Sequence, residues 1–216
     1  MSCRNVSFGE YCGHTVSPLI HVFHVVVGYR PTLKVYGREI VQSRHIAAFA
    51  TEPTLKLKYS GQQVAMHSPF PPLIQEIADR LSSSDCLGEA VGFNHCMLNR
   101  YENGNIYIGK HSDNLENKVI VTVSLGAPRT FILERKKPRA SKANSKAALA
   151  KAAQSFFEPR KADEKANSDA QSQACTQKKL VLGNGSLLVM QGDTQKNYTH
   201  EIPKERKVTE PRIVSD

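Results

Sequence analysis

The stretch Ile108-Gly109-Lys110-His111-Ser112-Asp113 decides how the fold of this chain is interpreted. Residues two apart on a strand point to the same face, so His111 and Asp113 can converge on one ion, and a distant strand can add His200 across a barrel. Two imidazoles and one carboxylate leave one face of an octahedral metal open, which suits non-haem Fe(II), whereas zinc more often takes a third protein ligand and one water. A His-x-Asp triplet also arises by chance in roughly one chain in four of this composition. A surface histidine beside a loop aspartate is therefore the alternative.

Short strands separated by glycine and asparagine turns surround this stretch on both sides. Apolar alternation and turn residues predict strands over 33–36, 54–59, 96–101, 106–108, 119–125, 130–134, 180–182, 186–190 and 198–202. Asn103-Gly104 between two of these segments predicts a hairpin. A helix is predicted to start at prolines 71–72, because Leu73, Ile77 and Leu81 follow at four-residue spacing. Many short strands with one preceding helix favour an α+β, mainly β fold of the barrel or jelly-roll type.

Length and charge suggest one domain with two atypical segments. The 216 residues suit a single domain, and 40% hydrophobic residues suffice for a packed core. We expect an N-terminal extension over 1–30 and a domain over 31–216 that is interrupted by a low-complexity insertion over 137–179. The insertion holds eleven Ala, ten Lys/Arg and four Asp/Glu, so it carries +6 of the net charge of +9. We expect it to be disordered and solvated, with a short Ala-rich helix or a basic arm for nucleic acid as alternatives.

Neither a membrane protein nor a secreted protein is expected. The longest apolar run, Leu19–Val27, is interrupted by His21 and His24 and is too short to span a bilayer. It also follows an acidic N-terminal segment, unlike a secretory signal. The five Cys show no Cys-x-x-Cys spacing, which disfavours a disulfide scaffold or a cysteine zinc site and favours a reducing compartment. We expect the nucleus or the cytoplasm, and the basic run 135–139 suits either a nuclear signal or a solvated loop.

Ordered sequence blocks extend the pattern well beyond the metal triplet. They are Val35-Tyr36-Gly37-Arg38, Tyr59-Ser60-Gly61, Pro69-Phe70-Pro71-Pro72, Leu98-Asn99-Arg100-Tyr101 and the segments 108–113, 123–131, 185–192, 198–200 and 207–213. In this order the blocks resemble the AlkB-like family of Fe(II)/2-oxoglutarate-dependent dioxygenases, in particular its eukaryotic DNA/RNA-repair members. The insertion is placed as in fungal forms. The resemblance covers about residues 33–136 and 180–213.

The resemblance implies a double-stranded β-helix with a defined set of site residues. The metal ligands it assigns to Fe(II) are His111, Asp113 and His200, and the residues it assigns to the cosubstrate 2-oxoglutarate are Asn99, Tyr101 and Arg212. Dioxygen is the second cosubstrate. Arginine suits the far carboxylate of a dicarboxylate because its planar fork donates two parallel hydrogen bonds, and tyrosine and asparagine add directed ones. Without the family blocks, the residues themselves favour the ordinary alternatives: a turn residue at Asn99, a core aromatic at Tyr101 and a solvated charge at Arg212.

The implied activity is oxidative demethylation of N-alkylated bases. Its substrates are 1-methyladenine and 3-methylcytosine, and its products include formaldehyde, succinate and CO2. Because such an enzyme must reach a base edge, the implied partner is alkylated DNA or RNA, either single-stranded or with the base flipped out of a duplex. Tyr59 and Arg129 are the candidate substrate contacts, with a core aromatic and a structural ion pair as the alternatives. We expect a monomer.

Two departures from the family pattern modify these expectations. Val214 stands where the family has asparagine, and the second arginine that closes the family motif is absent. We therefore expect the end of a core strand and one charge-assisted hydrogen bond to be missing, the latter worth roughly 1.5–3 kcal/mol. Asn114-Leu115 also stand where relatives place acidic residues after Asp113. An inactive or weakly active member that binds nucleic acid is thus an alternative, followed by a protein hydroxylase and a cupin-like binding module.

Overall fold

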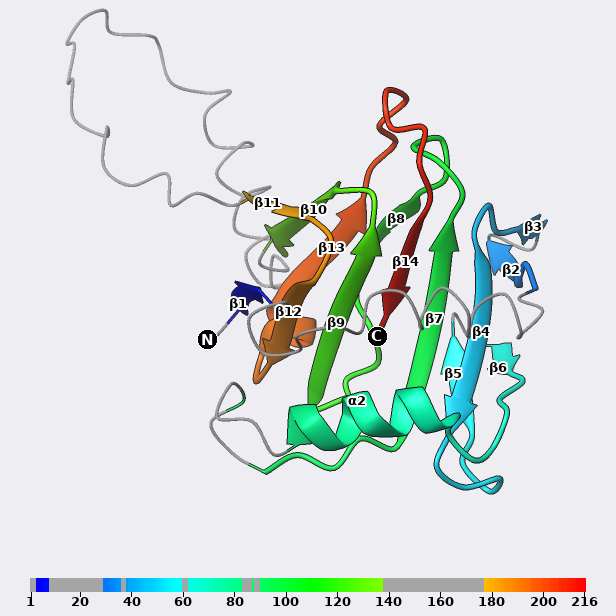
Figure 1. Ribbon diagram of the computed structural model, residues 1–216. Helices are drawn as coiled ribbons and strands as arrows, with labels where there is room; N and C mark the ends of the chain where they lie inside the picture. The colour runs from blue at the N-terminus through cyan, green and yellow to red at the C-terminus, as the bar shows by residue number, and fades with distance from the viewer. Residues whose placement is uncertain are drawn as a thin grey trace, which may run out of the picture.

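Two β-sheets stacked face to face form the body of the chain in the computed structural model, which describes residues 3–7, 29–35, 38–59, 62–82, 87, 90–137 and 177–216 (Figure 1). The larger sheet contains, in spatial order, β1 (Cys3–Ser7), β12 (Ser186–Gln191), β9 (Val119–Gly126), β14 (Arg212–Ser215), β7 (His95–Tyr101) and β4 (His45–Ala50). The smaller sheet contains β11 (Gln177–Leu182), β10 (Arg129–Arg135), β13 (Tyr198–Ile202) and β8 (Ile108–His111).

Four further strands and two helices complete the described elements. Two separate hairpins are formed by β2 (Thr32–Val35) with β3 (Arg38–Val41) and by β5 (Leu57–Tyr59) with β6 (Gln62–Val64). The helices are α2 (Pro72–Ser82) and α4 (Thr194–Asn197). Neither of these described helices has the length and apolar character needed to cross a bilayer.

Consecutive strands repeatedly change sheets, which is the connectivity of a jelly roll. β7 and β8 lie in different sheets, and so do β9 and β10, and β11 and β12. Every strand pair in both sheets is antiparallel. The predicted double-stranded β-helix, mainly β with a flanking helix, is confirmed.

The two faces of the larger sheet bury different partners because side chains alternate along each strand. Val121 and Val123 of β9 pack with Ile77 and Leu81 of α2, which lies across the outer face of this sheet (Figure 1). The neighbouring Ile120 points the other way and packs between the sheets. The predicted helix is thus confirmed, and it leaves the inner face of the sheet free to line a cavity.

The hairpin predicted at Asn103-Gly104 is wrong. The flanking strands β7 and β8 belong to different sheets and do not pair. Gly104 is required for a different reason: a Cβ at this position would lie 1.7 Å from the carbonyl oxygen of Glu205. The backbones of Gly104 and Glu205 approach so closely because they share a hydrogen bond of 2.8 Å from the Glu205 N–H to the Gly104 carbonyl.

Several boundaries differ from the sequence prediction. The strand predicted from 180 begins at Gln177, inside the expected insertion over 137–179, because this segment pairs with β10. The rest of the insertion, 138–176, lies outside the described residues. The expected extension over 1–30 supplies β1, which pairs with β12. β4 was not predicted, because its sequence His45–Ala50 is rich in alanine, a poor strand former, yet it is almost fully buried.

The core strand whose end was expected to be missing is β14, and it lies in the centre of the larger sheet. β14 pairs with β7 on one side and with β9 on the other, with Arg212 opposite Tyr101 and Val214 opposite Asn99. The ladder continues to Asp216, whose backbone N–H and C=O exchange hydrogen bonds of 3.0 and 2.8 Å with Met97. This strand carries Arg212 into the interior between the sheets.

Candidate metal centre and its cavity

A cavity of about 960 Å³ opens between the two sheets. Its wall includes the three predicted metal ligands and the three predicted cosubstrate residues, together with Arg44, Thr122 and Asp216. The inward faces of β7, β9 and β14 supply the polar side chains of one wall, and β8 and β13 supply the histidines of the other. The structure therefore brings Arg44 and residues between 99 and 122 together with residues between 200 and 216, which lie far away in the sequence.

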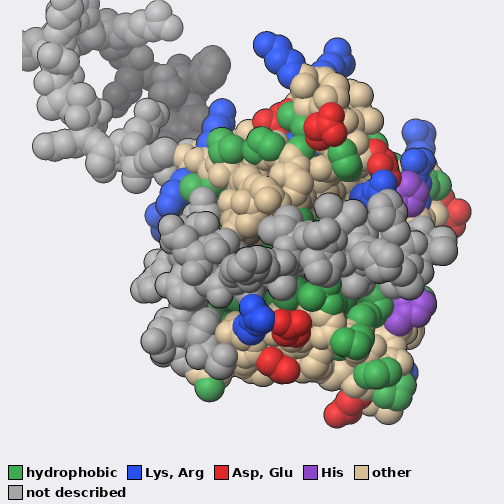
Figure 2. Space-filling view, viewed as in Figure 1, with side chains coloured by type: hydrophobic (Ala, Val, Ile, Leu, Met, Phe, Trp, Pro, Cys, Tyr) green, Lys and Arg blue, Asp and Glu red, His purple; other side chains and the backbone are tan. Residues whose placement is uncertain are grey.

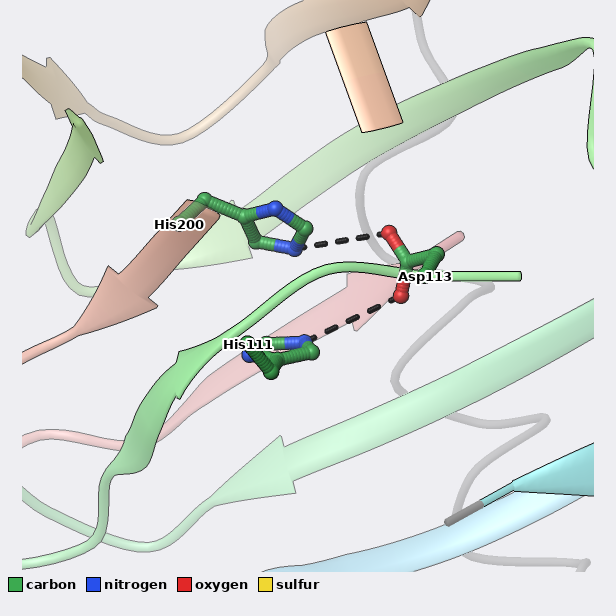
Figure 3. A group of neighbouring side chains, drawn as sticks. All are labelled: His111, Asp113 and His200. Atoms are coloured by element: carbon green, nitrogen blue, oxygen red, sulfur yellow. Dashed lines mark ion pairs between the residues drawn. The ribbon is translucent and has the colours of Figure 1, made fainter. Parts of the chain in front are cut away.

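The three predicted metal ligands converge on one point (Figure 3). His111 ends β8 and is the register partner of His200 on β13. The carboxylate of Asp113 faces both rings, with Oδ1 3.8 Å from His111 Nε2 and Oδ2 3.4 Å from His200 Nε2. One ligand atom from each residue lies within 4.8 Å of the others, which is the spacing of a group that can hold one metal ion.

Local hydrogen bonds orient the two ligands of the His-x-Asp segment. His111 Nδ1 lies 2.8 Å from the Gly109 carbonyl oxygen, so Nδ1 carries the proton and Nε2 keeps its lone pair for a metal. Ser112 points away from the ligands and donates a hydrogen bond of 2.9 Å to the Tyr198 carbonyl. The alternation expected of a strand thus continues past the end of β8, and it places His111 and Asp113 on the same side.

Burial shifts the pKa values of His200 and Asp113 in opposite directions. Burial lowers the pKa of His200 to about 3, with a smaller contribution from the charge of His111. His200 is therefore neutral near pH 7, as a metal ligand must be. Burial also raises the pKa of Asp113, an effect that electrostatic interaction with His111 and Arg44 opposes. A buried carboxylate beside two imidazole nitrogens fits a divalent cation, and the set of two His and one Asp is the facial triad of Fe(II) sites.

Arg212 is a buried cation with unsatisfied donors. Its side chain is 1% exposed, and its Nη2 donates a hydrogen bond of 2.8 Å to Ser124 Oγ. Its Nε and Nη1 are buried and have no hydrogen-bond partner among the residues that the structure describes. The guanidinium carbon lies 5.7 Å from the centre of the Tyr101 ring. Because unpaired buried donors are costly, these N–H groups fit a carboxylate ligand such as the far end of 2-oxoglutarate.

Asn99 lies in the cavity but is already engaged. Its Oδ1 accepts a hydrogen bond of 2.7 Å from Arg44 Nε, and its Nδ2 donates one of 2.9 Å to Asp216 Oδ2. The other carboxylate oxygen of Asp216 accepts 2.6 Å from Thr122 Oγ1. Asp216 lines the cavity, and burial raises the pKa of its side-chain carboxylate to about 6.

Sequence reasoning missed Arg44, Thr122 and Asp216. Arg44 is 1% exposed and lies just before β4, the strand that the sequence did not reveal. Thr122 lies between Val121 and Val123 in an otherwise apolar strand, so the pattern predicted a strand and gave no sign of a polar contact at this position. A charged residue immediately before an apolar segment is common on protein surfaces, so no sequence signal distinguished the buried Arg44.

The two predicted substrate residues lie in different situations. Arg129 does not line the cavity; it is 1% exposed and its Nε donates 2.9 Å to Glu205 Oε2. Its remaining nitrogens donate to three backbone carbonyls, those of Asn103, Ile106 and Pro203. The backbone of Tyr59 ends β5, whose Leu57 and Lys58 line the cavity, but the side chain of Tyr59 lies outside the described residues.

Comparisons with known proteins agree with this geometry. Residues 28–215 match the profile of the 2OG-Fe(II) oxygenase superfamily. The chain is 33% identical over 192 residues to a DNA oxidative demethylase ALKBH2 from Arabidopsis thaliana, covering 85% of this chain and 55% of that protein. It is 27% identical over 185 residues to the human DNA oxidative demethylase ALKBH2, covering 84% and 58%. The chain spans about half the length of these curated relatives.

The fold itself is shared with a solved structure. An oxidoreductase of the 2OG-Fe(II) oxygenase family from Burkholderia pseudomallei superposes with a TM-score of 0.54 at 11% identity, covering 99% of this chain and 83% of that one. At this identity the likeness concerns the fold alone. The profile match over 28–215 and the His-Asp-His group, together with this shared fold, identify the family. This chain belongs to the 2OG-Fe(II) oxygenase superfamily, whose cofactors are Fe(II), 2-oxoglutarate and dioxygen, and is an AlkB-like member of it.

Proposed function

We propose that this chain catalyses the oxidative demethylation of N-alkylated nucleic acid bases, namely 1-methyladenine and 3-methylcytosine. One observation carries the proposal: a single cavity holds the convergent group His111, Asp113 and His200 and also the unpaired N–H groups of Arg212. The relatives from Arabidopsis thaliana and Homo sapiens support the substrate class, because both are named DNA oxidative demethylases.

In this proposal the chain's residues divide between metal and cosubstrate. His111 and His200 bind Fe(II) through the Nε2 atoms that face the Asp113 carboxylate. When bound, the metal with 2-oxoglutarate and dioxygen supplies the oxidation of the N-methyl group, with formaldehyde, succinate and CO2 as products. Arg212 binds the far carboxylate of 2-oxoglutarate with its free Nε and Nη1, while Ser124 fixes the orientation of the guanidinium.

Tyr101 and Asn99 complete the cosubstrate side of the proposal. Tyr101 is 3% exposed and lies directly opposite Arg212 in the sheet, so its ring shields the guanidinium from water. Low local dielectric strengthens a charge-assisted hydrogen bond to a carboxylate. Asn99, two residues earlier on the same face of β7, holds Arg44 beside Asp113. We assign Asn99 the task of keeping this second cation in the wall of the cavity.

The proposed partner is a nucleic acid strand that presents one base to the cavity. Three exposed lysines, Lys56, Lys58 and Lys118, lie among the cavity-lining residues and form what we call the lysine rim. Phosphates on either side of a flipped base would meet these ammonium groups. Tyr59, which follows Lys58 on β5, is the proposed base-stacking residue. By contrast, Lys/Arg and Asp/Glu side chains are interspersed on the face that carries α2 (Figure 2).

Charge reversal at the lysine rim tests the partner. The triple variant Lys56→Glu, Lys58→Glu, Lys118→Glu should weaken binding of a single-stranded oligonucleotide and should flatten the slope of log K against log salt by roughly 0.7 for each phosphate that the rim no longer neutralises. The matched control is Lys178→Glu with Lys179→Glu on β11, because both lysines are exposed and neither lines the cavity. Equal weakening by the control would contradict the placement of the strand at the rim.

The reaction is tested by product formation. Protein loaded anaerobically with Fe(II), 2-oxoglutarate and a 3-methylcytosine oligonucleotide should release formaldehyde and succinate in equal amounts once air is admitted. An oligonucleotide with unmodified cytosine is the control. Binding of the methylated strand without either product would refute the enzymatic proposal and support the second candidate below.

The second candidate is a nucleic-acid-binding member with little or no turnover. The observation that favours it is the engagement of Asn99 by Arg44 and Asp216, which places a carboxylate inside the cavity that 2-oxoglutarate must enter. Val214 also stands where the family has asparagine. In both candidates we propose a monomer located in the nucleus or the cytoplasm. Gel filtration with light scattering and imaging of the tagged full-length protein test these two points.

A further inference from the structure

A glutamine outside the metal group contacts the backbone of the metal carboxylate. Gln195 lies in the single-turn helix α4, is 5% exposed, and accepts through Oε1 a hydrogen bond of 2.9 Å from the backbone N–H of Asp113. The two residues are 82 positions apart in the sequence. No sequence motif pointed to Gln195, and neither the metal nor the cosubstrate role assigned above involves it.

This contact matters because Asp113 lies beyond the end of a strand. β8 ends at His111, and Asp113 is in the irregular segment that follows. No strand-to-strand hydrogen bond therefore fixes the backbone of Asp113 within the described residues. The orientation of the carboxylate depends on what else holds this backbone. The Gln195 amide replaces the missing strand partner, since a hydrogen bond to the Asp113 N–H restricts the rotation that would swing the carboxylate away from the two histidines.

The amide of Gln195 has one orientation that satisfies its surroundings. Its Oε1 faces the Asp113 N–H, a donor, and its Nε2 faces Met190 Sδ at 3.7 Å, a weak acceptor. Turning the amide over would set its NH2 group against the Asp113 N–H, and two donors would then face each other. The environment therefore selects the orientation in which Gln195 accepts from Asp113.

The helix that carries Gln195 is itself tied to both sheets. Lys136, which follows β10, donates 2.8 Å from Nζ to the Gln195 carbonyl, and its backbone N–H donates 2.8 Å to the Asn197 carbonyl. Thr194 is 1% exposed and donates 2.7 Å from Oγ1 to the carbonyl of Gln191 at the end of β12. Because α4 is hydrogen-bonded to both sheets, Gln195 has a fixed position from which it can restrain the segment that follows β8.

The same segment also carries the third ligand. His200 follows α4 directly on β13, and the Tyr198 carbonyl at the start of β13 accepts the Ser112 hydroxyl. Two successive residues of the His111–Asp113 segment are thus bonded to residues 195–198. One short segment supplies His200 and sets the position of the other two ligands relative to it.

We propose that Gln195 is a positioning residue of the metal centre, which holds the Asp113 carboxylate in the geometry that binds the metal. The proposal rests on the metal site assigned above and adds a residue that contacts a ligand's backbone rather than the ion. Its consequence is that metal affinity depends on an amide that never touches the metal.

Titration of the metal-free protein with Co(II), followed by its visible absorption bands, tests the proposal without any turnover. Gln195→Met keeps the length of the side chain and removes the acceptor; we expect the Kd for Co(II) to rise about 10- to 100-fold, as for other groups that orient metal ligands. Gln195→Glu keeps an acceptor at the same reach, and we expect it to restore affinity to within about threefold of the wild type.

The matched control is Gln191→Met, which removes a nearby amide in the sequence whose Oε1 is buried and has no hydrogen-bond partner within the described part of the chain. It should leave the Kd for Co(II) unchanged. Circular dichroism of each metal-free variant verifies that it is folded. Wild-type affinity in Gln195→Met, no restoration by Gln195→Glu, or an equal loss in Gln191→Met would each overturn the role of Gln195. Absence of Co(II) binding by the wild-type chain would instead refute the metal site itself.

Discussion

His200 on β13 lies directly opposite His111 on β8, and the centres of their rings are 4.3 Å apart. Strand register alone brings the two imidazoles together, and the extended chain after β8 then places Asp113 against both. Phe131 stacks on His200 with ring centres 5.4 Å apart, so the deeper ring is held by packing as well as by the ladder. The two histidines of the metal group are therefore held by the sheet, and Asp113 lies in the segment that follows β8.

Replacing His200 by alanine should abolish metal binding and product formation. The substitution leaves only two of the three protein ligands of the facial triad. It also removes the imidazole that burial keeps neutral and able to bind a metal. Co(II) absorption and formaldehyde release measure the two effects. His67→Ala is the control, because His67 is exposed and is not part of the metal group. Co(II) bands of wild-type intensity in His200→Ala would exclude His200 as a ligand.

Arg212→Gln should weaken 2-oxoglutarate binding by about 10- to 150-fold, the equivalent of about 1.5–3 kcal/mol for a charge-assisted hydrogen bond. The unpaired Nε and Nη1 of Arg212 are the donors that the substitution removes. Isothermal titration of Mn(II)-loaded protein with 2-oxoglutarate measures the affinity. Arg212→Lys should recover only part of it, because an ammonium group cannot donate a parallel pair. An unchanged affinity in both variants would place the cosubstrate elsewhere.

Asp216→Asn should stabilise the metal-free protein near neutral pH. Burial raises the pKa of Asp216 from the ordinary 3.8 to about 6, and the charge of Asp113 adds to this, while the hydroxyl of Thr122 opposes it. Between about pH 4 and pH 6 the folded state therefore binds more protons than the unfolded state, so the free energy of unfolding falls as pH rises through this window.

The neutral amide removes that dependence. Urea unfolding should show Asp216→Asn more stable than wild type at pH 7.5 and nearly equal to it at pH 4. Exposed Asp193 supplies the matched control, Asp193→Asn, which should shift neither curve. Parallel wild-type and Asp216→Asn curves over the whole range would show that the Asp216 carboxylate is solvated rather than enclosed.

Arg129→Met should destabilise the fold by about 1–3 kcal/mol, because it removes the buried guanidinium that donates to Glu205 and to the carbonyls of Asn103, Ile106 and Pro203. Glu205→Gln should destabilise less, since an amide oxygen at the Oε2 position can still accept from Arg129 Nε and from the Thr130 N–H. Urea unfolding measures both, and a double-mutant cycle isolates the coupling. If Arg129 contacts substrate instead, Arg129→Met will weaken oligonucleotide binding while the unfolding curve stays in place.

The sequence predicted the site residues, single strands and the helix better than it predicted which strands pair with each other. Period-two alternation in β9 was visible because Val121, Val123 and Leu125 are all apolar, and the helix α2 was visible in its four-residue repeat. The predicted hairpin failed because the Asn-Gly signal reports only a local turn. Whether the strands on either side pair is decided by which partner buries their faces, and both β7 and β8 find that partner in strands far along the chain.

The His-x-Asp spacing made His111 and Asp113 candidate ligands, because residues two apart on a strand share a face, and the ordered family blocks were needed to assign them together with His200. The cation at Arg44, the carboxylate at Asp216 and the amide at Gln195 were decided by tertiary structure alone. Their roles come from burial and from contacts between residues 55 to 117 positions apart, and no local pattern records which distant group a side chain will meet.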